Sequence, residues 1–534
     1  MSSALIRPAT SGVALRDLVA RLGVSPDRQP DGNPLVMGVS LDSRTVLPGD
    51  LYAALPGVNA HGADFAAQAY ERGAVAVLTD AVGADRVPAG VPVVAVERPR
   101  EVLGAVAACV YGQPSADLTM IGVTGTNGKT TTAYLIESAL RAHGRRTGLI
   151  GTVETRLGDE VIHSVRTTPE TTDLHALLAL MRERGLDTCV MEVSSHALAL
   201  HRVDGVIYDV ALFTNLSQDH LDFHADMLDY YRAKASLFTP ARSRRAVVGV
   251  DDGWGVRLAA EASVPVTTVS TSDTPADWVV ARSGDDGTFT LRARDGSQLR
   301  LVSHLAGTFN VANTALAALA LVAIGLELPA VEAAMAAPPD VPGRMQLVSA
   351  GAPRSGDRPG LPRCIVDFAH TPVAVDAALA ALRPSTSGRL IVVLGAGGDR
   401  DRGKRPLMGA AAARHADVVV VTDDNPRSEQ PAAIRAAVLA GARQLIESGS
   451  ATATELIDGG ARAAAIARSV AIGVDEPKLR SGADAVATGD SVDTVIVLGK
   501  GHEKGQEIDG VMHPFDDRDA VLAALSAATT GARP

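Results

Sequence analysis

The segment Gly125-Thr126-Asn127-Gly128-Lys129-Thr130-Thr131 follows an apolar run at residues 118–123 and precedes a helical pattern. A strand, a glycine turn and a helix start in this order predict a loop whose backbone N–H groups surround a phosphate. In such a loop Lys129 reaches the terminal phosphates and the hydroxyl of Thr130 can bind Mg²⁺. The spacing is shorter than in the standard P-loop, which has glycine where Val123 stands, and a chance Gly/Lys/Thr loop is the alternative.

Short apolar runs alternate with helical patterns on both sides of this segment, which predicts an α/β protein with parallel sheets. Breaks in the alternation predict three domains, at residues 1–114, 115–346 and 347–534. Strands are predicted at residues 36–42, 50–54, 74–78, 91–96, 118–123, 147–153, 188–193, 210–214, 246–250, 364–367, 390–395, 417–422 and 494–498. Helices are predicted at residues 62–72, 310–325 and 330–337, a hairpin at 278–301, and an exposed loop at 349–363.

Composition excludes several classes of protein. The net charge of −11 and the lack of a long basic stretch argue against nucleic-acid and anionic-membrane partners. No signal-peptide core and no long apolar run is visible, so we expect a cytoplasmic protein. The three cysteines, Cys109, Cys189 and Cys364, lie far apart without metal-site or disulfide spacing, and we expect buried thiols.

Three polar residues downstream of the phosphate loop are candidates for the active site. Two lie at or near predicted strand ends, and the third lies on a predicted helix. Glu192 ends an apolar strand, where it can bind Mg²⁺ or be an ordinary surface acid. His220 lies in a loop with a second histidine and two carboxylates, which indicates either a metal or catalytic site or a structural histidine. Lys234 lies on a predicted helix between Tyr230 and Phe238, where a neutral amine could add CO₂ and become a metal-binding carbamate. An ordinary solvated lysine is the alternative.

Further candidates lie near the second boundary and in the third domain. Asn310 can pair with an adenine edge or cap a helix, and Arg344 can neutralise a phosphate. Charged loops follow three predicted strands of the third domain, at residues 399–404, 424–427 and 499–503. Acids and arginines at neighbouring strand ends favour a small ligand that carries both carboxylates and an ammonium group.

Taken in order, these motifs resemble the Mur ligases, the ATP-dependent amino-acid ligases of peptidoglycan assembly. The resemblance extends from about residue 41 to residue 518 and implies a uridine-nucleotide-binding first domain, a central P-loop ATPase-type sheet and a Rossmann-like third domain. It implies an ATP site formed by Gly125, Thr126, Asn127, Gly128, Lys129, Thr130, Thr131, Asn310, Arg344 and Asp367. It implies catalytic roles for Lys129, Glu192, His220 and Lys234, and Mg²⁺ binding by Thr130, Glu192, His220 and a carboxylated Lys234.

Within the family the resemblance is to members that add meso-diaminopimelate to UDP-N-acetylmuramoyl-L-Ala-D-Glu. It implies a uridine-dipeptide site formed by Leu41, Ser43, Val58, Asn59, Ala60, Thr167, Thr168, Ser194 and Arg202. The diaminopimelate site would consist of Arg400, Asp424, Asn425, Pro426, Arg427, Gly499 and Glu503. An arginine in that pocket can hold the second carboxylate, which lysine lacks. Two departures are visible, because Leu200 and Arg166 stand where some relatives have glutamine and asparagine.

We therefore expect a monomeric ligase that uses ATP and Mg²⁺ and forms an acyl phosphate before the amide bond. The nearest alternatives are a lysine-adding relative and a folylpolyglutamate synthase. Arg427 disfavours the first, and the uridine-site pattern disfavours the second. A regulatory P-loop switch is the alternative of a different class. It lacks support because the sequence has no Asn-Lys-x-Asp motif that would bind guanine.

Overall fold

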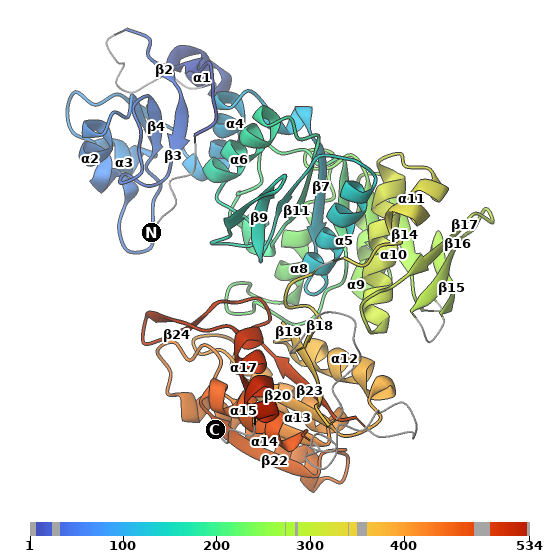
Figure 1. Ribbon diagram of the computed structural model, residues 1–534. Coiled ribbons are helices and arrows are strands. Elements are labelled where there is room, and N and C mark those ends of the chain that lie inside the picture. Colours follow the sequence, from blue (N-terminus) through green and yellow to red (C-terminus); the bar gives the residue numbers. More distant parts are fainter. Residues whose placement is uncertain are drawn as a thin grey trace.

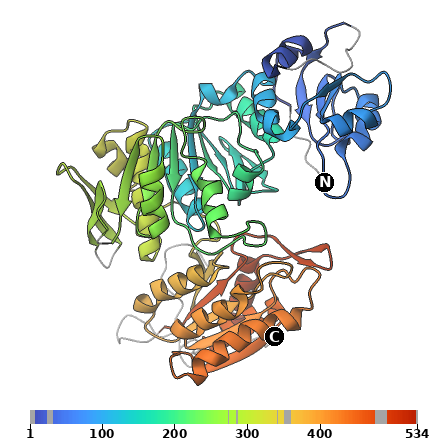
Figure 2. The same ribbon diagram turned by 180° about the vertical axis from the view of Figure 1, so that it is seen from behind.

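The computed structural model describes residues 7–23, 32–272, 274–283, 287–339, 341–349, 360–474 and 492–530. Three α/β units follow one another along the chain, and the central unit lies between the other two in both views (Figures 1 and 2). The predicted α/β class with parallel sheets is confirmed. The boundaries predicted after residues 114 and 346 stay a prediction, and residues 350–359 of the predicted loop lie outside the described residues.

The N-terminal unit has a four-stranded parallel sheet in the order β3-β4-β5-β6. Its strands are β3 (Gly38–Ser40), β4 (Asp50–Ala53), β5 (Ala76–Thr79) and β6 (Val93–Ala95), beside a small pair formed by β1 (Val13–Ala14) and β2 (Leu35–Val36). Its helices are α1 (Leu15–Leu22), α2 (Ala66–Glu71), α3 (Ala81–Arg86) and α4 (Pro99–Val110). The single helix predicted at 62–72 is wrong in detail. A 3-10 turn, η1 (Gly62–Phe65), starts under a His61 cap, and α2 then forms a separate short helix.

The central unit has an eleven-stranded sheet in the order β10-β9-β8-β11-β7-β12-β13-β14-β15-β16-β17. Its strands are β7 (Thr119–Thr124), β8 (Thr147–Ile150), β9 (Glu154–Leu157), β10 (Glu160–His163), β11 (Thr188–Glu192), β12 (Val210–Phe213), β13 (Ala246–Gly249), β14 (Val266–Ser270), β15 (Trp278–Ser283), β16 (Thr288–Ala293) and β17 (Gln298–Val302). Strands β8 to β15 of this order pair in parallel, and the flanking strands are antiparallel. The predicted hairpin is therefore part of an antiparallel extension of the sheet.

The helices of the central unit cover both faces of its sheet (Figure 1). They are α5 (Lys129–Ala142), α6 (Thr171–Glu183), α7 (Ser195–Ala199), α8 (Met227–Ala235), α9 (Gly253–Glu261), α10 (Thr308–Ala323) and α11 (Leu328–Ala334), preceded by the 3-10 turn η2 (Pro114–Asp117). The two helices predicted at 310–325 and 330–337 correspond to α10 and α11.

The C-terminal unit has a six-stranded sheet in the order β18-β19-β23-β20-β21-β22, parallel except for β18. Its strands are β18 (Gln346–Val348), β19 (Arg363–Asp367), β20 (Leu390–Leu394), β21 (Val418–Thr422), β22 (Glu455–Gly460) and β23 (Thr494–Leu498), and a separate hairpin joins β24 (Gly505–Ile508) and β25 (Val511–Pro514). Its helices are α12 (Pro372–Leu382), η3 (Arg383–Ser385), α13 (Lys404–His415), α14 (Pro431–Glu447), α15 (Arg462–Ile472) and α17 (Asp517–Thr530).

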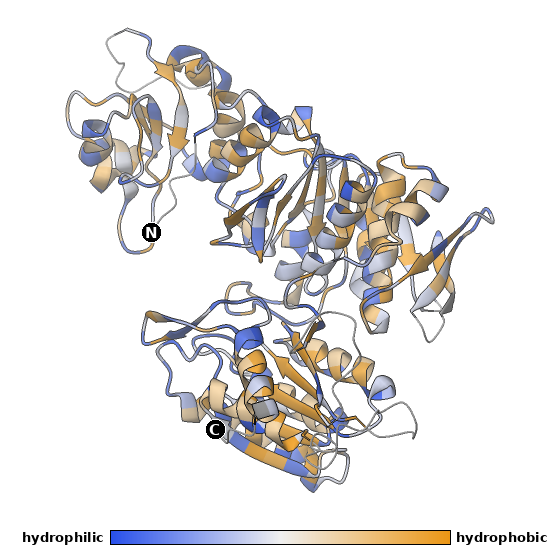
Figure 3. Ribbon diagram, in the orientation of Figure 1, coloured by the Kyte–Doolittle hydropathy of each residue, from blue (hydrophilic) through white to orange (hydrophobic). Residues whose placement is uncertain are grey.

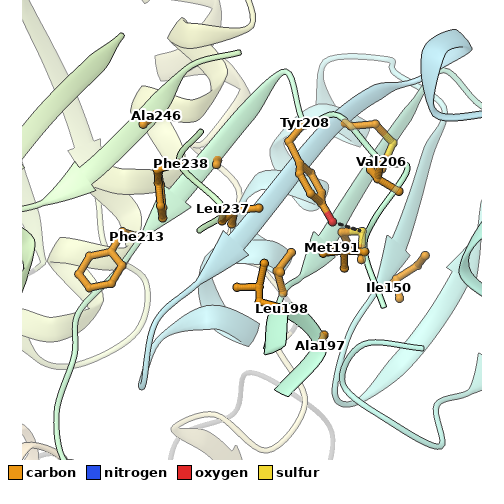
Figure 4. Packing of buried hydrophobic residues seen from close by; sticks show 14 of the residues in the cluster. Ile150, Met191, Ala197, Leu198, Val206, Tyr208, Phe213, Leu237, Phe238 and Ala246 are labelled. Carbon is orange, nitrogen blue, oxygen red and sulfur yellow. Dashed lines mark hydrogen bonds between the residues drawn. The ribbon is translucent and has the colours of Figure 1, made fainter. Parts of the chain in front are cut away.

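The strands of the sheets consist mostly of hydrophobic residues, whereas the loops contain more hydrophilic ones (Figure 3). On one face of the central sheet Tyr208, Met191 and Phe213 pack in a buried cluster, with the Tyr208 hydroxyl 3.2 Å from Met191 Sδ (Figure 4). A Cβ on Gly122 in β7 would lie 2.8 Å from the Tyr208 ring, so glycine lets this ring pack directly on the strand that leads to the phosphate loop.

The predicted buried thiols are confirmed, since all three cysteines are buried and free. Within the described part of the chain, every helix is too short or too polar to cross a bilayer.

Candidate functional site

The phosphate loop connects β7 to α5, as the sequence predicts. Gly125 and Gly128 have φ angles of 147° and 88°, a region in which residues with a Cβ are strained. Asn127 is held by the end of the next strand, because its backbone N–H donates to Asn215 Oδ1 (3.0 Å) and its carbonyl accepts from Thr214 Oγ1 (2.6 Å). The loop is thus held in a curved shape in which its backbone N–H groups can face an anion.

Lys129 and Thr130 begin helix α5. The Lys129 ammonium folds back onto the loop and donates to the carbonyls of Gly125 and Thr126, both at 2.9 Å. The Thr130 hydroxyl lies 3.0 Å from both carboxylate oxygens of Glu192 and accepts from Arg344 Nη2 at 3.0 Å. Thr131 is buried in the first turn of α5. Lys129, Thr130, Glu192 and Arg344 therefore lie around one loop, although they come from three distant parts of the chain.

Glu192 is fully buried at the carboxyl end of β11, next to β7, so the surface-acid alternative is wrong. Its carboxylate also accepts from the backbone N–H and the hydroxyl of Thr152, at 2.8 and 3.0 Å. A hydroxyl and a carboxylate side by side are the hard oxygen ligands that Mg²⁺ prefers. Thr130 and Glu192 would therefore be suitable oxygen ligands for Mg²⁺ beside the phosphate loop.

Lys234 on α8 is only 1% exposed, so the solvated-lysine alternative is wrong. Its ammonium donates to the Gly125 carbonyl at 2.8 Å and lies 4.7 Å from the centre of the Tyr230 ring. Lys129 donates to the same carbonyl oxygen, so two amines share one acceptor in a buried place. Burial first, and then the charge of Lys129, hold the pKa of Lys234 well below its usual value. This crowding favours the neutral form of the Lys234 amine.

His220 follows β12 and has a φ of 54°, a left-handed backbone. Burial lowers the pKa of its imidazole to about 3, although the neighbouring Asp219 favours the charged form. Asp219 Oδ2 lies 3.5 Å from His220 Nε2. Burial alone would raise the pKa of Asp219, but His220, His370 and Lys404 lower it to about 2. Asp219 is thus an ionised acid of this site that the sequence pattern did not single out.

The predicted metal ligands form two groups. Glu192 binds Thr130 and Thr152, whereas His220 faces Asp219. Among the described residues, no three His, Cys, Asp or Glu side chains gather in a ready-made metal site.

Asn310, Arg344 and Asp367 lie where the central and C-terminal units meet. Asn310 lies on α10 and is buried, with its amide bonded to the Ala306 carbonyl and to Asn313 of the same helix. Its polar edge is therefore engaged inside the protein and not presented to a base. The Arg344 guanidinium lies 4.3 Å from the Phe368 ring centre.

Asp367 serves a different purpose at the same junction. Its carboxylate accepts the backbone N–H groups of Met345 (2.7 Å) and Ala369 (2.8 Å). Burial raises the pKa of Asp367, with Arg344 and these two hydrogen bonds acting against it. Asp367 thereby fixes the turn that carries Arg344 toward the phosphate loop.

The residues predicted to bind the uridine dipeptide fall into two places. In the N-terminal unit, Ser43 donates to Gln68 Oε1 at 2.7 Å, and Leu41 is half-buried. The remaining members there, Val58, Asn59 and Ala60, form an exposed loop, with the Val58 side chain fully open to solvent.

In the central unit, the other predicted dipeptide residues surround the backbone of Glu192. The Thr168 hydroxyl donates to the Glu192 carbonyl at 2.9 Å and accepts from the Ser194 N–H at 3.0 Å. Thr167 Oγ1 accepts from the hydroxyl of Thr152 at 3.1 Å. Arg202, the last predicted member, pairs with Glu170 at 2.8 Å.

Most of the residues predicted to bind the amino acid lie on two loops of the C-terminal unit, at 424–427 and 499–503. Lys500, fully buried, donates to Asn425 Oδ1 (2.9 Å) and Glu503 Oε2 (3.1 Å) and lies 3.8 Å from Asp424 Oδ1. Gly499 has a φ of 115°, and a Cβ there would lie 2.5 Å from Asp424 Oδ2. The pocket residues are therefore held together by Lys500, which the sequence motifs did not identify.

Arg427, on the first of these two loops, has a left-handed backbone. Its Nε donates to Glu507 Oε2 (3.0 Å) and its Nη1 donates to the Gly398 carbonyl (2.7 Å). The Pro426 carbonyl accepts from the Glu429 N–H at 3.0 Å. Glu507 comes from the β24–β25 hairpin, so this hairpin orients the guanidinium.

Loops of the central and C-terminal units face each other across the site. Arg400 Nη1 lies 3.8 Å from Asp222 Oδ2, and His370 Nε2 lies 4.0 Å from Asp219 Oδ2. The predicted pocket residue Arg400 is thus at the junction between the two units.

Comparison with known proteins agrees with this arrangement. Family models described as "Mur ligase family, catalytic domain", "Mur ligase middle domain" and "Mur ligase, glutamate ligase domain" match residues 35–111, 123–322 and 343–473. The chain is 52% identical to the UDP-N-acetylmuramoyl-L-alanyl-D-glutamate–2,6-diaminopimelate ligase of Streptomyces avermitilis, over 97% of this chain and 98% of the relative. It is 46% identical to the protein of the same name from Corynebacterium glutamicum, over 93% of each chain.

Solved structures give the same result. A structure of a UDP-N-acetylmuramoyl-L-alanyl-D-glutamate–2,6-diaminopimelate ligase matches with a TM-score of 0.63 and 30% identity, covering 97% of this chain and 99% of that one. The folylpolyglutamate synthase of Mycobacterium tuberculosis, solved with ADP and AMPPCP, shares the fold with a TM-score of 0.52 at 20% identity, over 81% of this chain and 95% of that one. With family models along most of its length and relatives this similar over nearly all of it, the chain belongs to the Mur ligase family of ATP-dependent amide ligases.

Proposed function

We propose that this enzyme joins meso-diaminopimelate to the D-glutamate side-chain carboxyl of UDP-N-acetylmuramoyl-L-Ala-D-Glu, with ATP as the energy source. The names of relatives 52% and 46% identical support this choice. The observation that carries it is that Arg427, whose guanidinium is held by Glu507, belongs to the same loop as Asp424 and Asn425, and that Asn425 donates to Glu503. Two carboxylates can hold the ammonium of the distal centre, and the guanidinium can hold its carboxylate.

The reaction has two steps. An oxygen of the substrate carboxylate attacks the γ-phosphorus of ATP, and ADP leaves. The free amine of diaminopimelate then attacks the acyl carbon, inorganic phosphate leaves, and the amine loses a proton. Lys129 and Arg344 lie at the phosphate loop, where they neutralise the charge that moves during transfer. The protein otherwise contributes by orienting the reactants and by excluding water from the acyl phosphate.

Magnesium belongs to this proposal, and Thr130 and Glu192 would hold it because their oxygens meet beside the loop. When bound, the ion would screen the phosphate charges from the attacking carboxylate. We further propose that the neutral Lys234 amine adds CO₂, forming an N–C bond and releasing one proton, to give a carbamate. The anion would then face Lys129, which removes the conflict between two amines at one acceptor. His220, neutral at physiological pH, completes the proposed set.

All of these residues come from one chain, so we propose that a monomer is sufficient for activity. The substrates also indicate the compartment: ATP and a UDP-linked sugar are cytoplasmic metabolites, and we place the reaction there.

Phosphate release by purified enzyme tests the proposal. Release is expected only when ATP, UDP-N-acetylmuramoyl-L-Ala-D-Glu and meso-diaminopimelate are all present, with a matching mass for the product. Equal rates with L-lysine would contradict the role of Arg427. ATP hydrolysis without either acceptor substrate would favour a nucleotide switch and would contradict the ligase.

A further inference from the structure

One glutamate joins two arginines across the junction of the N-terminal and central units. Arg100 lies on α4 of the N-terminal unit, Glu170 precedes α6, and Arg202 follows α7. Arg100 Nη1 lies 3.2 Å from Glu170 Oε2, and Arg202 Nη2 lies 2.8 Å from Glu170 Oε1. Each oxygen of a single carboxylate therefore binds a guanidinium from a different unit.

Arg100 has a second partner in the same segment. Its Nη1 also donates to the carbonyl of Leu200 at 3.3 Å, two residues before Arg202. Leu200 has no polar side chain, so Arg100 contacts this residue through its backbone carbonyl. Arg100 therefore contacts both Glu170, which pairs with the Arg202 side chain, and the backbone of Leu200, which lies close to Arg202 in the sequence.

Arg202 has capacity for a further acceptor. Its Nε is buried, and no described residue accepts a hydrogen bond from it. A buried N–H group without an acceptor is destabilising, so an acceptor from a ligand would be favourable. The charges nearby favour an anion. The positive charges of Arg166 and Arg100 both act on Arg202, and Glu170 is the acidic side chain that acts on it. Burial raises the pKa of Asp173, an acid that interacts with the same Glu170 and Arg166.

We infer that Arg100 is a positioning residue for the carboxylate-bearing end of the substrate: it holds Glu170, and Glu170 orients Arg202 with Nε toward the ligand. This inference rests on the proposed function, which puts the dipeptide at Thr168, Ser194 and Arg202. Because Arg100 belongs to the unit predicted to bind the uridine end, the bridge also sets the spacing between the two ends of one substrate. Arg100 would thereby make binding depend both on the distance between the two ends of the substrate and on the negative charge at one of them.

The experiment compares R100A, R100K, E170Q and the R100A/E170Q double variant with wild type. R98A is the matched control, because Arg98 lies just before the same helix, is 67% exposed and, among the described residues, forms an ion pair only with Glu101. We expect R100A to raise KM for UDP-N-acetylmuramoyl-L-Ala-D-Glu about tenfold, with KM for ATP and diaminopimelate within about twofold. R100K should recover most of the loss. The double variant should be no worse than about the worse single variant.

Several results would overturn the inference. The coupling of Arg100 to Arg202 through Glu170 would be contradicted if R100A left KM for UDP-N-acetylmuramoyl-L-Ala-D-Glu unchanged, or if R98A had an equal effect. It would also be contradicted if the effects of the two single changes multiplied in the double variant. So would a fall in melting temperature that is accompanied by equal changes in all three KM values. Calorimetric titration of each variant with UDP-N-acetylmuramoyl-L-Ala-D-Glu distinguishes a failure of this inference from a failure of the proposed function. If wild type binds this ligand but forms no amide, the proposed function fails while the effect of Arg100 on binding is still measured.

Discussion

Replacing Lys500 with methionine is expected to weaken binding of the amino acid while leaving the other substrates nearly unaffected. Lys500 is fully buried and donates to Asn425 and Glu503, the polar residues of two different loops. Methionine has a similar length and flexibility, so the change removes mainly the charge and the donors. Without the ammonium, the carboxylates of Asp424 and Glu503 would repel each other across the pocket.

The size of the effect follows from the contacts. A hydrogen bond to a charged group contributes about 1.5–3 kcal/mol, and two such bonds are lost. Part of the loss is compensated, because Asn425 Oδ1 keeps the N–H of Glu507 (3.0 Å) and the Glu503 side chain is 36% exposed. We therefore expect about 2–3 kcal/mol, which corresponds to a rise of about 30- to 150-fold in KM for meso-diaminopimelate.

The assay is initial-rate phosphate release with each substrate varied in turn. Lys504→Met is the control, since Lys504 is exposed and only four residues away. A meso-diaminopimelate KM within about threefold of wild type would refute the reasoning. A drop in melting temperature with parallel changes in all three KM values would also refute it, because Lys500 would then be merely structural.

Three further predictions address the Lys234 amine beside the phosphate loop, a buried histidine and a buried ion pair. Lys234→Ala should lower turnover by about 100-fold or more, with partial rescue by added acetate, because a free carboxylate can replace the carbamate; a normal rate would remove the carbamate from the mechanism. His175 is fully buried, its Nε2 lies 3.0 Å from the Asp204 carbonyl, and burial lowers its pKa to about 4. The unfolded chain thus binds more protons, and the unfolding free energy should fall as pH drops from about 6.5, by about 3 kcal/mol at pH 4. Urea titrations of wild type and His175→Asn should show a shallower pH slope in the variant, and equal slopes would contradict this account. Asp517 forms two 2.7 Å bonds to Arg462 with both side chains fully buried, so Asp517→Asn should destabilise the C-terminal unit by about 3–5 kcal/mol. The exposed Asp519→Asn on the same helix is the control, and equal melting curves for the two variants would refute the prediction.

Much of the fold could be predicted from the sequence because its signals are local. The buried parallel strands are short, continuous apolar runs, and β21 (Val418–Thr422) is an example. The hairpins β9–β10 and β24–β25 and the edge strand β22 were not predicted. Their residues are mixed in polarity and largely half-buried or exposed, as in Glu455–Gly460, so no clear period marks them.

The sequence alone determined the phosphate loop and the α/β alternation, because glycine spacing and apolar runs act on neighbouring residues. Only the tertiary structure decided which charges are buried and with whom they pair. Lys234 became a buried amine because Gly125, 109 residues away, folds over it. Arg100 and Glu170 are 70 residues apart and meet only where two domains pack. The energy of a charged side chain depends far more on whether it is buried than on the residues next to it in the sequence. Burial is decided only when the whole chain packs.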